Sequence, residues 1–142
     1  MDDRSCLNLI RHGAAVFLAG LLAGVPYALV ITGAMAGEDR AWRMAHAEGI
    51  QNGLLLLAVA GIGGKLALDA RKSRLASLGL IAAAWGNVIA SVIGAATGNR
   101  GLEATGPAAN LLVYGLFLVA IVGVFTGVGL VVAGAGNAAK QR

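Results

Sequence analysis

Apolar residues in this chain gather into long uninterrupted blocks rather than recurring at helical or strand spacing. Four blocks are long enough to cross a hydrocarbon core of about 30 Å, which takes roughly 20 helical residues. They cover about residues 12–35, 44–68, 75–97 and 110–133. This pattern predicts an all-α fold, a polytopic membrane four-helix bundle in which residues 1–142 form a single four-transmembrane-helix domain.

The composition agrees with a membrane bundle. Hydrophobic residues make up 58% of the chain, the mean hydropathy is +0.78, and charged residues make up 13%. A soluble domain carries about 25% charged residues. The 22 glycines favour close helix packing, because small residues let membrane helices approach one another.

The net charge of +4 is unevenly distributed. Most basic residues fall in the N-terminal stretch, the second connection and the C-terminus, which are predicted to share one side of the membrane: Arg4, Arg11, Lys65, Arg71, Lys72, Arg74, Lys140 and Arg142. Short segments rich in lysine and arginine stay cytoplasmic. We therefore expect a multi-pass protein of the inner (cytoplasmic) membrane with both termini cytoplasmic. No basic patch with interleaved aromatic residues indicates a nucleic-acid partner.

Two of the predicted spans carry polar side chains. Such residues are costly inside a bilayer and by default indicate function. The second span contains His46, Glu48, Gln51 and Asn52, and the third contains Trp85, Asn87 and Ser91.

Helical geometry sorts these side chains into faces. At about 100° per residue, His46 shares a face with Gly49 and Gly53. That bare surface fits either another helix backbone or the flat face of a macrocycle whose metal the imidazole binds. Asn52 lies about 120° round from His46, and Asn87 and Ser91 are i, i+4 neighbours in a small polar groove.

Each of these residues also has a purely structural interpretation. His46 fits a membrane interface, and the amides fit hydrogen bonds between helices. Trp85 fits ordinary packing, and Glu48 fits an ion pair with Arg43. The residues alone leave the chemistry of the site open.

Several motifs together resemble the styrene oxide isomerase family. They are Trp42-x-x-Ala45-His46-(x)5-Asn52-Gly53, Trp85-x-Asn87, Asn99-Arg100-Gly101-Leu102 followed by Gly106-Pro107, and His12-Gly13 near the N-terminus. The resemblance covers roughly residues 12–125.

The resemblance implies a homotrimer in the lipid bilayer with ferric haem b at each subunit interface. His46 matches the axial histidine and so the metal ligand, and Asn52 matches the asparagine that polarises the substrate. Gly49, Gly53 and Trp85 are then expected to contact the cofactor, with Asn87 and Ser91 beside Asn52 in the catalytic pocket. The implied reaction turns a small hydrophobic epoxide into a carbonyl (a Meinwald rearrangement), with the iron as a Lewis acid.

The sequence departs from the family pattern at two positions. Ser91 stands where the family has a tyrosine beside the haem, and Ala83 stands where it has an aspartate. The leading hypothesis is an intramolecular epoxide isomerase. The alternatives are a non-catalytic haem protein for sensing or storage, and a haem-free structural bundle.

Overall fold

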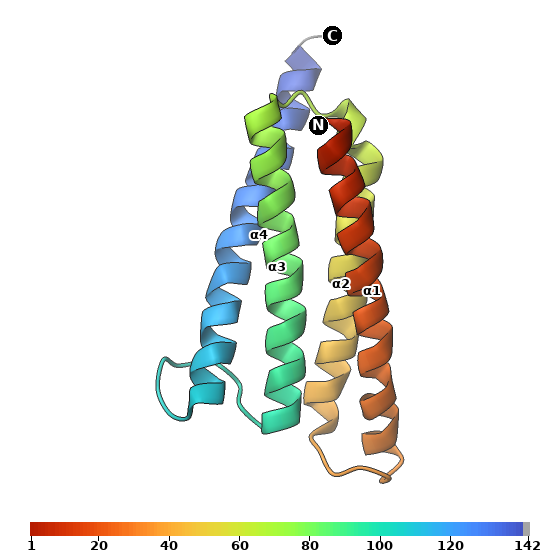
Figure 1. Ribbon diagram of the computed structural model, residues 1–142, viewed down its shortest axis with the longest axis vertical. Coiled ribbons are helices and arrows are strands. Elements are labelled where there is room, and N and C mark those ends of the chain that lie inside the picture. Colours follow the sequence, from red (N-terminus) through yellow and green to blue (C-terminus); the bar gives the residue numbers. More distant parts are fainter. Residues whose placement is uncertain (141–142) are drawn as a thin grey trace.

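The computed structural model describes residues 1–140 and shows four long helices side by side (Figure 1). They are α1 (Asp3–Ile31), α2 (Asp39–Ile62), α3 (Ala70–Thr97) and α4 (Ala108–Lys140), with a short 3-10 turn η1 (Gly63–Lys65) after α2. There is no β-strand within residues 1–140. The all-α bundle expected from the sequence is therefore confirmed.

All four helices begin earlier than the apolar blocks indicate, and in α1 and α3 an aspartate caps the polar first turn. The Ser5 amide donates to the Asp2 carboxylate at 2.8 Å, so α1 begins at Asp3 rather than near residue 12. The Lys72 amide donates to the Asp69 carboxylate at 2.8 Å and starts α3. This hydrogen bond also lowers the pKa of the Asp69 carboxyl.

The bundle consists of two helical hairpins, α1–α2 and α3–α4. In each hairpin, glycines let the two helix backbones approach closely. A Cβ added to Gly49 would lie 2.3 Å from the Gly20 Cα, so α1 and α2 touch backbone to backbone. A Cβ added to Gly123 would lie 2.5 Å from the Gly79 carbonyl oxygen in the second hairpin.

An apolar core fills the space between the hairpins, with Leu9, Val16, Leu56, Leu80 and Val88 buried in it. The N-terminus, the α2–α3 connection and the C-terminal end of α4 lie at one end of the bundle (Figure 1). The basic segments of the described chain therefore share one end; Arg142 lies outside the described residues.

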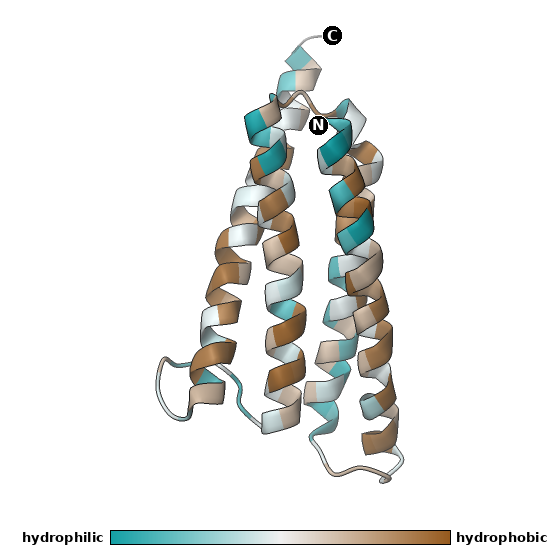
Figure 2. Ribbon diagram, viewed as in Figure 1, coloured by the Kyte–Doolittle hydropathy of each residue, from teal (hydrophilic) through white to brown (hydrophobic). Residues whose placement is uncertain are grey.

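Three helices, α1, α3 and α4, are long and apolar enough to cross a membrane. Within the described residues, α2 does not meet that threshold, because hydrophilic residues occupy its N-terminal half (Figure 2). In the bundle this more polar helix packs alongside α1. The arrangement with four membrane spans stays a prediction.

Candidate functional site

His46 lies in the first half of α2 and faces α1. Its Nδ1 atom is 2.8 Å from the Gly20 carbonyl oxygen, and its ring stacks against Tyr27 with centroids 6.2 Å apart. A carbonyl can only accept a hydrogen bond, so Nδ1 carries the proton and the Nε2 lone pair is left for a ligand.

This arrangement suits metal ligation. Histidine ligands commonly donate their second ring N–H to a carbonyl or carboxylate, which fixes the tautomer and raises the basicity of the ligating nitrogen. Within residues 1–140 no group of three or more His, Cys, Asp or Glu side chains could hold a bare metal ion. A porphyrin supplies four ligands itself, so a single imidazole of this kind fits haem.

Gly49 and Gly53 are buried against α1 and occupy the face below His46. Cβ atoms added to them would lie 2.3 Å from the Gly20 Cα and 2.6 Å from the Phe17 amide nitrogen. Of the two surfaces that fit this stripe, a helix backbone is the one observed, and the contact of both glycines with haem stays a prediction. They act on His46 indirectly, because their contact brings the Gly20 carbonyl to the imidazole.

Glu48 connects two of the predicted catalytic residues. The Ser91 hydroxyl donates to the Glu48 carboxylate, and the Asn52 amide donates to the Glu48 backbone carbonyl at 2.9 Å. The suggested Glu48–Arg43 ion pair is wrong, because within residues 1–140 the carboxylate is bonded to Ser91 instead. The sequence did signal Glu48, as an acidic residue in a predicted span.

The predicted site residues do not converge on one point within the chain. His46 and Glu48 are two residues apart on α2, and about 200° of rotation separates them. His46 therefore faces Gly20 on α1, while Glu48 faces Ser91 on α3. Asn87 is half-buried one helical turn before Ser91.

Trp85 is hydrogen-bonded to His12, a residue not predicted for the site. The indole N–H donates to the His12 Nδ1 at 3.1 Å, which links α3 to α1. The Nδ1 atom of His12 accepts, so the proton of its neutral ring lies on Nε2. His12 thus has the opposite tautomer from His46 and no free lone pair for a metal.

Comparison with known protein families gives a match that covers most of the bundle. A family model described as styrene oxide isomerase matches residues 6–136. Among curated proteins, none matches the chain. The matched range includes His46, Asn52 and Ser91 and extends from α1 into α4.

Proposed function

The chain belongs to the styrene oxide isomerase family, and from this membership we propose that it is a membrane isomerase that converts a small hydrophobic epoxide into its carbonyl isomer. We propose further that it binds ferric haem b through the Nε2 atom of His46. The observation that carries this proposal is the hydrogen bond from His46 Nδ1 to the Gly20 carbonyl, which leaves Nε2 deprotonated and oriented by α1.

The reaction requires no external oxidant or reductant. Opening one epoxide C–O bond and moving a hydrogen to the neighbouring carbon gives an aldehyde or ketone with the same atoms. Haem iron, when bound, supplies a Lewis acid for the epoxide oxygen.

Asn52 is suited to orient the epoxide. Its side-chain amide has two N–H groups, and one donates to the Glu48 carbonyl at 2.9 Å. That bond fixes the amide, so the second N–H can donate to the epoxide oxygen. Ser91 stays a candidate for lining the pocket, but its hydroxyl proton is committed to Glu48, so it would not donate to the epoxide.

We propose a homotrimer in the cytoplasmic membrane with both termini cytoplasmic. Arg43 and Gln51 are exposed on α2, where contact with lipid would be costly. A second copy of the chain would cover them. The basic residues gathered at one end of the bundle support the orientation.

The function is tested by incubating the haem-loaded protein with aryl epoxides and measuring the carbonyl product. We expect His46→Ala to abolish turnover. Asn52→Ala should keep the haem and lower kcat about 100-fold, because one hydrogen bond to the developing oxyanion is lost. His12→Ala serves as the matched control and should keep both haem and activity. Equal product from wild type and His46→Ala would rule out this function.

One observation favours a non-catalytic haem protein as the second candidate. Ser91 replaces a tyrosine, and its hydroxyl is bonded within the protein rather than free. That candidate predicts a haem spectrum that changes on adding cyanide or imidazole, with no product from any epoxide tested.

A further inference from the structure

A cavity of about 180 Å³ lies at the end of the bundle opposite the termini, bounded by α2, α3, α4 and the loop between α3 and α4. Its interior is mainly apolar, with Met44, Ala90, Val113 and Phe117 among the lining residues. Of the predicted site residues, Ser91 lines it, whereas His46 and Asn52 do not. It is therefore separate from the proposed haem ligand, on the α3 side of α2.

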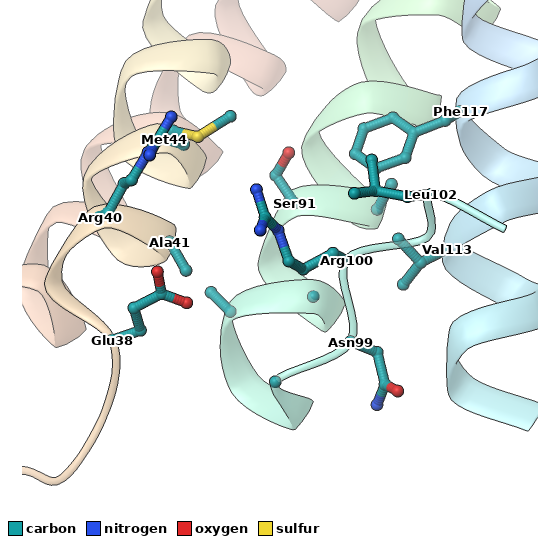
Figure 3. A pocket seen from close by; sticks show the side chains of 14 residues that line it. Glu38, Arg40, Ala41, Met44, Ser91, Asn99, Arg100, Leu102, Val113 and Phe117 are labelled. Atoms are coloured by element: carbon teal, nitrogen blue, oxygen red, sulfur yellow. The ribbon is translucent and has the colours of Figure 1, made fainter. Parts of the chain in front are cut away.

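The mouth of this outer cavity is charged. Arg40 comes from the first turn of α2, Arg100 from the loop, and Glu38 from the residue before α2. Figure 3 shows Arg100 extending from the loop into the space between α2 and α3, toward Ser91. Two guanidinium groups and one carboxylate leave a net positive charge beside an apolar interior.

Neither arginine forms an ion pair with an acidic side chain in the part of the chain that the structure describes. Within residues 1–140 the sole ion pair joins Lys72 to Asp69, at the opposite end of the molecule. Arg40, Arg100 and Glu38 are all exposed at the mouth, so both guanidinium groups remain available to an anion.

The loop that carries Arg100 is held in a defined conformation by hydrogen bonds and packing. The Asn110 side chain accepts from the Gly101 amide at 2.9 Å and donates to the Glu103 and Thr105 carbonyls at 2.9 and 2.8 Å. Gly101 has φ 61°, and a Cβ there would lie 2.5 Å from the Val113 side chain. Asn110 and Gly101 therefore fix the loop against α4, which sets the direction of Arg100. The proposed function does not use the motif Asn99-Arg100-Gly101-Leu102, and here its role is to position Arg100 at the mouth of the cavity.

We propose that the outer cavity binds an amphipathic anion, with its apolar body in the cavity and its carboxylate or phosphate oxygens on Arg40 and Arg100. Arginine is suited to such oxygens because its guanidinium presents a fork of N–H donors. An engineered cavity of about 150 Å³ takes up benzene, so this volume fits one ring or a short acyl segment. The anion can be a free carboxylate or an anionic lipid, and haem binding is not required.

Calorimetric titration of the detergent-purified protein with benzoate tests whether the anion is a free carboxylate. We expect binding that is weakened about tenfold or more in Arg100→Gln and in Arg40→Gln, since each removes a charge-assisted hydrogen bond. Arg43→Gln is the matched control, because Arg43 is exposed on the same helix but does not line the cavity, and its affinity should equal that of wild type. Benzamide, which has the same size without the charge, should bind at least tenfold more weakly than benzoate.

Native mass spectrometry after reconstitution with phosphatidylglycerol or phosphatidylcholine tests whether the anion is an anionic lipid. Retention of phosphatidylglycerol by wild type and Arg43→Gln, with loss in Arg100→Gln, identifies a lipid as the anion; benzoate should then bind only after delipidation. The proposal is overturned if neither benzoate nor phosphatidylglycerol distinguishes Arg100→Gln from Arg43→Gln. The result is independent of the haem spectrum, so either proposal can fail alone.

Discussion

At the scale of single residues, the site depends on hydrogen bonds that assign each donor and acceptor. The Gly20 carbonyl fixes the proton of His46 on Nδ1, and the Trp85 indole fixes that of His12 on Nε2. Two histidines of the same chain therefore differ in which ring nitrogen carries the proton. The difference is set by their neighbours on other helices.

The first prediction concerns the space beside the imidazole. A Cβ added to Gly24 would lie 2.9 Å from His46 Nδ1, so Gly24→Ala should displace the ring from the Gly20 carbonyl. We expect haem affinity to fall about tenfold, in the range found when a hydrogen bond to a ligating histidine is lost. Haem titration followed by absorbance measures this effect. Gly61→Ala is the control, since nothing lies within 4 Å of its added Cβ; equal affinities of the two variants would contradict the prediction.

The second prediction concerns the Glu48–Ser91 hydrogen bond. Ser91→Ala should lower the free energy of unfolding by about 1–3 kcal/mol, because a half-buried carboxylate loses its donor. Adding Glu48→Leu to Ser91→Ala removes the carboxylate as well and should recover part of that loss. Unfolding of the four proteins of this double-mutant cycle in detergent gives the coupling energy. Simple additivity of the two changes would show that the bond contributes nothing.

At the scale of helices, the glycine contacts set how closely the elements approach. The Gly20–Gly49 contact is backbone against backbone, so no side-chain rotation can make room for a methyl group. The separation of α1 and α2 and the position of the His46 ring therefore depend on the same pair of glycines.

The third prediction follows from this contact. Gly49→Ala should push α1 and α2 apart and lower the free energy of unfolding by about 1–3 kcal/mol, the usual cost of overpacking. It should also weaken haem binding, because the Gly20 carbonyl moves with α1. Thermal unfolding and haem titration measure the two effects. In Gly129→Ala the added Cβ meets nothing within 4 Å, so this variant should match wild type or be slightly more stable.

The sequence was sufficient to predict the elements but not their rotation about their axes. The apolar blocks predicted four helices, but the caps at Asp2 and Asp69 start α1 and α3 in polar sequence ahead of those blocks. The stripe of Gly49 and Gly53 correctly indicated a close approach but could not identify α1 as the partner. Glu48 and Ser91 are 43 residues apart, so their bond depends on the rotation of both helices.

At the scale of the whole molecule, two glycine-packed hairpins meet along an apolar core and a few polar links. Trp85–His12, Ser91–Glu48 and the 3.4 Å bond from Ser77 to the Ser5 carbonyl join α3 to the first hairpin. Both described chain ends and the α2–α3 connection lie together, away from the outer cavity.

The fourth prediction concerns orientation in the membrane. With the basic end cytoplasmic, green fluorescent protein fused after the C-terminus should fluoresce in cells. Alkaline phosphatase inserted in the loop between α3 and α4 should be active, because that loop faces the outside. An active phosphatase at the C-terminus would reverse the orientation and place the outer cavity on the cytoplasmic side.

The most direct measurement of the central claim is the absorption spectrum of wild type, His46→Ala and His12→Ala, each purified with haem supplied during expression. If the Nε2 atom of His46 binds the iron, wild type and His12→Ala show a Soret band and His46→Ala shows none. A colourless wild-type protein, or a His46→Ala variant with the wild-type Soret band, would contradict the assignment of His46 as the haem ligand.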